Sequence, residues 1–188
     1  MNLVYLGIVL FGGLHLFSSL LPAMRNRLQA WWGEAIYKGL YSVISLLGVG
    51  LMFWGYAQTR GNGDMLYVPP LGPNVAAMLM VLAGLILIVA ANVKSNIKMY
   101  VAHPFSIGFS LIAVAHLLTN GKTAVVWIFA TFLVVSLLDI AASTLRGNRA
   151  VFEPNVRSDG IAVAVGLVVF VVLLFGFHPY VLGVKLMR

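Results

Sequence analysis

The sequence contains no cysteine and very few charged residues. Of its 188 residues, 9% are charged and 61% are hydrophobic. The absence of cysteine excludes disulfide bonds, thiolate metal sites and catalysis by a cysteine nucleophile. An average soluble domain carries charge on roughly 25% of its residues, so this chain could not cover a water-facing surface. We therefore predict an integral membrane protein whose exterior is mostly in contact with membrane lipid.

A strict alternation of apolar and polar residues is also lacking, which argues against an outer-membrane β-barrel. The apolar stretches are continuous instead, as in residues 161–177. A helix needs about 20 apolar residues to cross the hydrocarbon core of a bilayer. The predicted fold class is therefore all-α, a single polytopic transmembrane domain over residues 1–188. Its six expected helices, forming one bundle, span residues 3–21, 39–57, 75–93, 104–119, 124–145 and 160–177.

The positive charges lie mainly in the short connections between these apolar stretches. The net charge of +7 therefore indicates membrane topology, and we expect no nucleic-acid partner. Connections that carry an excess of Lys and Arg stay on the cytoplasmic side. One side holds eight of these residues (Arg25, Arg27, Lys38, Lys94, Lys98, Arg146, Arg149 and Arg157) and the other holds four (Arg60, Lys122, Lys185 and Arg188). The bias predicts a multi-pass protein with both termini outside the cytoplasm.

Ionisable side chains are rare in the apolar stretches, so each is a candidate functional residue. They are His15, His103, His116, His178 and Asp139. For each histidine the alternative is a neutral ring satisfied by a backbone carbonyl or by a neighbouring hydroxyl. Asp139 is the one acidic residue within a predicted span, and either an ion pair or a role in proton transfer is consistent with its position.

Small residues accompany two of these histidines. His15 follows Gly12 and Gly13, and His116 lies near Gly108 and Ala113. Small side chains allow another helix, or a flat cofactor, to approach the backbone closely. Two histidines on different helices are typical of bis-imidazole haem b, which needs no cysteine for attachment. Tight helix packing explains the small residues equally well.

The pattern His-Pro-x-x-x-Gly occurs twice, at residues 103–108 and 178–183. Proline is favoured at the first position of a helix, and the residue before it can cap the helix. The pattern is therefore consistent with two similar helix starts or with a duplicated functional element.

Several of these segments resemble the NnrU family. The hallmark segments are His-Pro-Phe-Ser-Ile-Gly at 103–108 and Ala-His-Leu-Leu-Thr-Asn-Gly at 115–121. Residues 15–16, 39–45 and 178–179 are similar to it as well, so the likeness covers nearly the whole chain. NnrU proteins are bacterial membrane proteins associated with nitrite and nitric oxide reduction. The resemblance implies a location in the bacterial inner membrane.

The NnrU family is in turn similar to 15-cis-zeta-carotene isomerase, a haem b membrane enzyme. By motif, the axial haem ligands of that enzyme correspond to His15 and His116. His103 is the second choice as partner of His15, because its predicted depth in the membrane is closer to that of His15. The isomerase has a cysteine one turn before its second ligand, and this chain has Ala113 there. Two further departures are Ala102, where arginine is usual, and Lys122, where aspartate is common.

The resemblance leaves three functions open. The favoured one is a haem b protein with an accessory or redox role in denitrification. The first alternative is a haem-dependent cis–trans isomerase that acts on a lipophilic, carotenoid-like polyene, and its catalytic residues stay unassigned. The second alternative is a transporter whose histidines carry protons. Similarity to isoprenylcysteine-type methyltransferases is weaker, because Ala102 replaces their basic residue and a downstream acidic pair is missing.

Overall fold

The computed structural model describes residues 1–59, 63–72, 74–147 and 152–183, and over these residues it contains helices and no strand. The all-α fold class is therefore confirmed. The elements are α1 (Asn2–Leu20), α2 (Pro22–Trp32), α3 (Glu34–Thr59), α4 (Val75–Ala90), α5 (Asn96–Tyr100), α6 (Pro104–Thr119), α7 (Thr123–Leu145), α8 (Val156–Val172) and a π-helical segment, η1 (Leu173–Val181). They form two compact units, which are described separately. The first contains α1, α2, α3 and α7, and the second contains α4, α5, α6, α8 and η1.

All six predicted helices are present, with ends that differ by a few residues from the predicted ones. The largest difference at a helix start is in α3, which begins at Glu34 and not at residue 39. Lys38, which we assigned to a connection, therefore lies inside α3 and pairs with Glu34 one turn earlier. Opposite charges four residues apart stabilise a helix, which explains why α3 extends beyond its apolar stretch.

Two helices, α2 and α5, were not predicted. Pro22 follows the end of α1 and opens α2, because proline at a first helical position needs no hydrogen-bond donor. Gly33, with φ +84°, ends α2 in a backbone conformation that favours glycine. The short helix α5 is capped by Ser95, whose hydroxyl accepts a hydrogen bond from the Lys98 amide at 3.1 Å. Neither helix is apolar enough to be found by hydropathy.

Among the described residues, four helical segments are long and apolar enough to cross a membrane: α1, α3, α7, and α8 together with η1. The apolar helices α4 and α6 have 16 residues each, or about 24 Å along the axis, which is shorter than a bilayer core of about 30 Å. Large apolar side chains lie on the outside of the spans, for example Leu46 and Val168, which are 71% and 62% exposed. The molecule is thus an all-α membrane protein.

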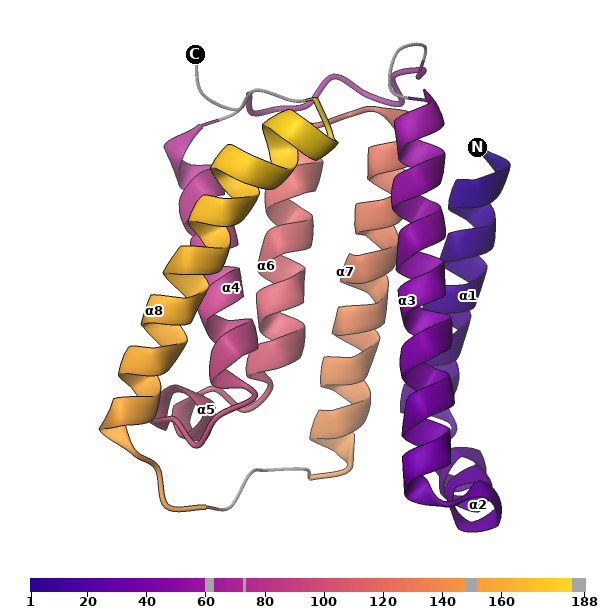
Figure 1. Ribbon diagram of the computed structural model, residues 1–188, viewed down its shortest axis with the longest axis vertical. Helices are drawn as coiled ribbons and strands as arrows, with labels where there is room; N and C mark the ends of the chain where they lie inside the picture. The colour runs from indigo at the N-terminus through magenta and orange to yellow at the C-terminus, as the bar shows by residue number, and fades with distance from the viewer. Residues whose placement is uncertain (60–62, 73, 148–151, 184–188) are drawn as a thin grey trace. The chain divides into compact units, whose positions relative to one another are not determined.

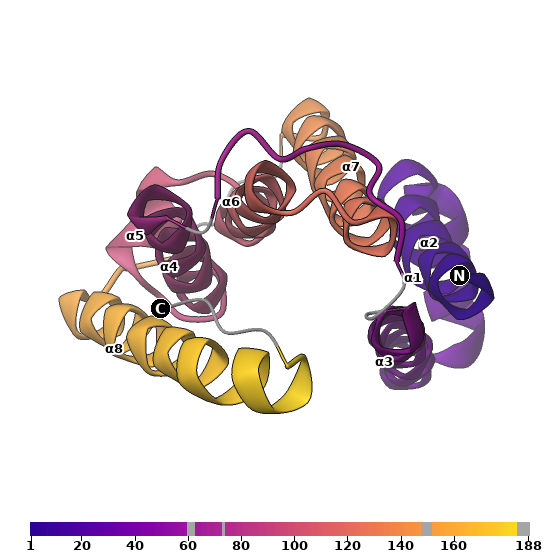
Figure 2. The same ribbon diagram turned by 90° about the horizontal axis from the view of Figure 1, so that it is seen from above.

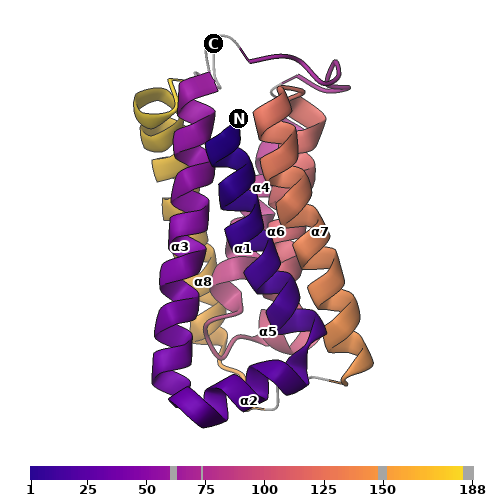
Figure 3. The same ribbon diagram turned by 90° about the vertical axis from the view of Figure 1, so that its right-hand side faces the viewer.

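In the first unit, α1 lies beside α3 (Figure 1) and also packs against α7. Helices α1 and α3 approach closely where Gly7 meets Gly48, since a Cβ atom on Gly7 would lie 2.5 Å from the Gly48 carbonyl oxygen. The short helix α2 runs across one end of α1 and α3 and joins them (Figure 3). This packing brings one face of α1 against polar side chains of α3 and α7.

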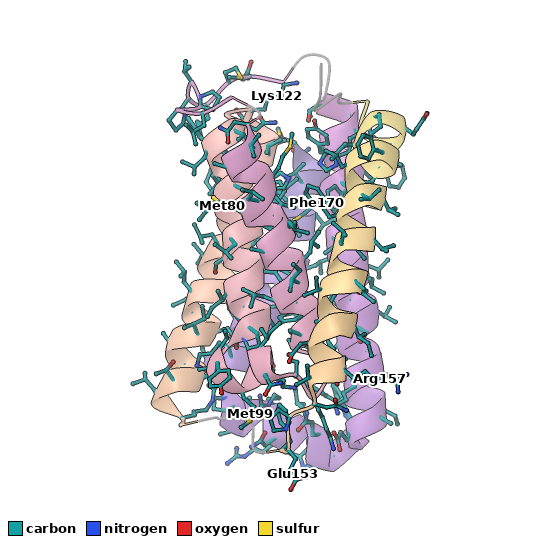
Figure 4. The ribbon with its side chains drawn as sticks, turned by 90° about the vertical axis from the view of Figure 1, so that its left-hand side faces the viewer. Met80, Met99, Lys122, Glu153, Arg157 and Phe170 are labelled. Atoms are coloured by element: carbon teal, nitrogen blue, oxygen red, sulfur yellow. The ribbon has the colours of Figure 1, made fainter. Side chains whose placement is uncertain are left out.

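In the second unit, α4 contacts both α6 and α8 and lies between them when the structure is seen from above (Figure 2). Gly84 of α4 faces Gly108 of α6, and a Cβ atom on Gly108 would lie 2.5 Å from the Gly84 carbonyl oxygen. At one end of this unit lie Met99 of α5, Glu153 and Arg157 (Figure 4). Charged residues at this end, next to apolar helices, are typical of helices that leave a membrane here.

Candidate functional site

His15 lies on α1, on the face that meets α3. Its ring stacks on Phe11 with centroids 4.0 Å apart, and its centroid is 5.1 Å from that of Tyr41 on α3. Its Nδ1 donates a hydrogen bond of 2.8 Å to the Phe11 carbonyl oxygen. Because a carbonyl oxygen only accepts, the proton is on Nδ1 and the lone pair of the neutral ring is on Nε2. His15 is thus held in one tautomer, in which Nε2 is the nitrogen that could bind a metal.

A polar network lies next to His15 in the first unit. Ser19, one turn further along α1, donates a hydrogen bond of 2.7 Å from its hydroxyl to the Asp139 carboxylate. The Arg146 guanidinium donates to the Ser19 carbonyl oxygen at 2.8 Å and to the Ser143 hydroxyl at 2.9 Å. Asp139 is also near enough to His15 to interact with it electrostatically. Ser19 therefore links the Asp139 carboxylate to the Arg146 guanidinium.

Two hydroxyl groups on α3 are buried beside this network. Tyr37, Tyr41 and Ser45 are spaced by four residues, so they lie on one face of the helix. Within the described part of the chain, the hydroxyls of Tyr37 and Ser45 are buried and make no hydrogen bond. Buried polar groups are nearly always hydrogen-bonded, so a polar ligand or water fits here. Tyr41 and Ser45 lie in the segment 39–45 that resembles the NnrU family, but the residue types alone did not mark any of the three as functional, because isolated tyrosine and serine in an apolar helix are typical of ordinary packing.

His116 and His178 lie together in the second unit. Their ring centroids are 6.3 Å apart, and the ring planes are inclined by 20°. The Nδ1 of His116 donates a hydrogen bond of 2.8 Å to the Ile112 carbonyl oxygen. The Nδ1 of His178 donates one of 2.7 Å to Leu173. Each ring is therefore held by its own helix in the same tautomer as His15.

The setting of His178 corrects an expectation from the repeated His-Pro-x-x-x-Gly pattern. His178 and Pro179 do not begin a helix but lie inside η1, which continues α8. In a π-helix the bonds join residues five apart, and His178 bonds to the carbonyl five residues earlier. Of the two helix starts that we considered, only the one at residue 104 is present.

His103 is the N-cap residue of α6, but its side chain makes no capping hydrogen bond, so the expected capping role is wrong. It is thirteen residues from His116 in sequence, or about 20 Å along one helix. The two cannot therefore bind one metal ion from a straight α6.

The small residues near the histidines prove to serve helix packing in part. Gly108 faces the α4 backbone, as described above, and Ala113 is fully buried. On α1, a Cβ atom on Gly12 would lie 3.2 Å from the Thr131 methyl carbon of α7, whereas a Cβ atom on Gly13 would meet nothing within 4 Å. The hydrogen bonds from the histidines to backbone carbonyls also agree with the alternative that these rings are neutral and have no functional role. They occupy only Nδ1, so they are equally compatible with ligation through Nε2.

The candidate ligands are divided between the units. His15 belongs to the first unit, and His116 and His178 belong to the second. In the part of the chain that the structure describes, no three His, Asp or Glu side chains gather into a metal site. A metal bound within one unit would thus have one or two imidazole ligands from the described residues. Such ligands suit a metal that carries other ligands of its own, as haem iron does.

Comparison with known proteins places the chain in one family. No curated protein and no solved structure matches it. The family described as NnrU protein matches residues 3–186, which is nearly the whole length. The chain therefore belongs to the NnrU family.

Proposed function

We propose that this membrane protein binds haem b through His15 and His116 and has an accessory redox role in nitrogen oxide metabolism. The observation that carries the proposal is common to both residues. Each Nδ1 donates to the carbonyl oxygen four residues earlier in its own helix. A hydrogen bond of this kind orients a ligating histidine and raises the basicity of its other nitrogen.

The surroundings of His15 also fit this cofactor. Haem b has an apolar ring system and two carboxylates, which need hydrogen-bond donors when they leave water. The aromatic ring of Phe11 and the buried Tyr37 hydroxyl supply an apolar surface and a donor respectively. When bound, haem b supplies reversible one-electron transfer. The residues of this chain would hold the group and keep the imidazole lone pairs available.

A redox role is favoured over isomerisation because of Ala113. The related isomerase has a cysteine at this position, and the fully buried methyl group of Ala113 offers no second ligand. A thiolate cannot compete with His116 in a chain without cysteine. The association of the NnrU family with nitrite and nitric oxide reduction supports the same choice.

Protein purified from haem-sufficient cells is expected to contain haem b. The pyridine haemochrome assay measures this directly, and the spectra of the oxidised and reduced protein should show a Soret band. A variant with both His15→Ala and His116→Ala provides the control, because it keeps every other residue near the two rings. Homogeneous, folded wild-type protein without a Soret band would refute the proposal.

We also propose that the protein lies in the bacterial inner membrane with both termini outside the cytoplasm. The support is the eight-to-four division of Lys and Arg between the two sides. Lys38 still lies near one end of α3, where its charge contributes to the same side.

Reporter fusions test the topology. A reporter active only outside the cytoplasm should be active after Arg60 and Lys122 and inactive after Arg149. Arg60 and Arg149 lie outside the described residues. A second reporter, fluorescent only in the cytoplasm, should give the opposite pattern at the same three positions. Activity that is reversed at all three would show that the termini face the cytoplasm.

A further inference from the structure

We propose that His116 and His178 bind one transition-metal centre as a pair of trans imidazoles. The inference concerns residues of the second unit alone. It assigns a ligand role to His178, which the proposed function leaves unused. The shared chemistry is a metal that accepts two imidazole nitrogens on opposite sides, and its source is either haem iron or a free tetragonal ion such as Cu²⁺.

The separation of the rings is the first argument. Metal–nitrogen bonds to histidine are about 2.0–2.1 Å long, and a ring centroid lies about 1 Å behind its nitrogen, so trans imidazoles on one metal have centroids roughly 6 Å apart. The observed separation is 6.3 Å. A direct hydrogen bond between the rings would bring the centroids to about 5 Å, and tetrahedral ligation would also shorten the separation. The distance therefore favours trans ligation.

The tautomers are the second argument. Each Nδ1 donates to a carbonyl oxygen of its own helix, to Ile112 for His116 and to Leu173 for His178. In both neutral rings the lone pair is consequently on Nε2. The same nitrogen of each ring is therefore the ligating one, as in histidine ligands whose other nitrogen is bound to a carbonyl.

The backbone of η1 is the third argument. It forms a π-helix, a rare structure that occurs frequently at functional sites. The π-helical bond pattern supplies the carbonyl of Leu173 to His178, five residues away. Relative to an α-helix, the wider turn changes the direction in which following side chains leave the axis. The rare π-helical bonding thus occurs at the residue whose ring lies beside His116.

The number of protein ligands is the fourth argument. No third His, Asp or Glu joins the pair among the residues that the structure describes. A metal held here must obtain its remaining ligands elsewhere. Haem iron has four porphyrin nitrogens, and Cu²⁺ in a tetragonal site accepts water or a buffer ligand. The haem case rests on the haem binding of the proposed function, but it makes His178 and not His15 the partner of His116, so the two pairings are alternatives that the experiment distinguishes.

Two arms of one experiment test the inference, both with full-length protein purified without a histidine tag. In the first arm, haem-free protein receives one equivalent of Cu²⁺, and electron paramagnetic resonance detects nitrogen coupling. In the second arm, haem-loaded protein is examined by visible spectroscopy for low-spin iron. His178→Ala and His178→Gln are compared in both arms with His103→Ala, a control in the same unit. Circular dichroism verifies the helix content of each variant.

We expect His178→Ala and His178→Gln to weaken Cu²⁺ binding roughly tenfold or more if the source is a free ion. If the source is haem iron, the low-spin signal is lost in these variants, persists in His15→Ala, and returns when imidazole is added. Equal behaviour of the His178 and His103 variants in both arms would overturn the inference. If wild-type protein from haem-sufficient cells purifies without haem but binds Cu²⁺ through His178, only the proposed function is refuted. Haem ligation that depends on His15 alone, without a copper site, would refute only the inference.

Discussion

Replacing His116 with alanine is expected to abolish the low-spin, six-coordinate haem spectrum and to lower haem content roughly tenfold or more. His116 is a ligand in the proposed function and in the further inference, so no other single change should have a larger spectroscopic effect. Its Nδ1 bond to Ile112 lies within α6 and also disappears in the variant. That loss leaves no buried acceptor unsatisfied, because the Ile112 carbonyl still accepts the backbone N–H bond of α6 from residue 116.

The matched control is His103→Ala, which removes the same side chain from the other end of the same helix. His103 makes no capping bond, so its loss should not shorten α6. The spectrum of this variant should equal that of the wild type. Absorption spectra of both variants, recorded with and without dithionite, decide the matter. Loss of low-spin haem in His103→Ala, together with its retention in His116→Ala, would mean that membrane depth was the better guide to the ligand.

The six predicted helices could be found because each depends on one local property, a continuous apolar stretch. The helices that were missed depend on other properties. Pro22 and Gly33 delimit α2, and the polar residues between them, such as Arg25 and Arg27, interrupt any long apolar stretch. The early start of α3 depends on the Glu34–Lys38 pair, whose charges had indicated a connection. Helix ends were thus the least predictable part, because single caps and ion pairs determine them.

Part of the candidate site could also be predicted. His15 and His116 were selected because an ionisable group in an apolar stretch is costly and therefore rare. Their bonds to carbonyl oxygens one turn earlier follow from helix geometry alone. The polar partners of His15 could not be predicted, because Tyr41 and Asp139 come from α3 and α7 and meet α1 only after packing.

The proximity of His116 and His178 could not be predicted from the sequence, for a different reason. The repeated His-Pro-x-x-x-Gly pattern was the one available signal, and it suggested a helix start at Pro179. The structure has a π-helix there, with Pro179 inside it. The choice between α- and π-helical bonding depends on small energy differences that packing against other helices can reverse. The sequence pattern therefore identifies the histidine but does not predict the type of helix in which it lies.

The largest expected effect on stability comes from Gly7→Ala in the first unit. A Cβ atom at this position would lie 2.5 Å from the Gly48 carbonyl oxygen and 2.8 Å from the Met52 amide nitrogen. Both are backbone atoms, so the clash cannot be relieved by a side-chain rotation, and α1 and α3 must separate. Overpacking of this kind costs roughly 3 kcal/mol. For a chain of this length, the midpoint of thermal unfolding in detergent should fall by roughly 5–10 °C.

Gly13→Ala is the matched control, since it makes the same change in the same helix where a Cβ atom would meet nothing within 4 Å. Alanine has the higher helix propensity by about 0.5–1 kcal/mol, so this variant should be as stable as the wild type or slightly more stable. The comparison cancels the effect of propensity and isolates the contact with α3. Circular dichroism of both variants during heating gives the two midpoints. Equal midpoints for Gly7→Ala and Gly13→Ala would contradict the close approach of α1 and α3, and with it the packing that brings His15 to Tyr41.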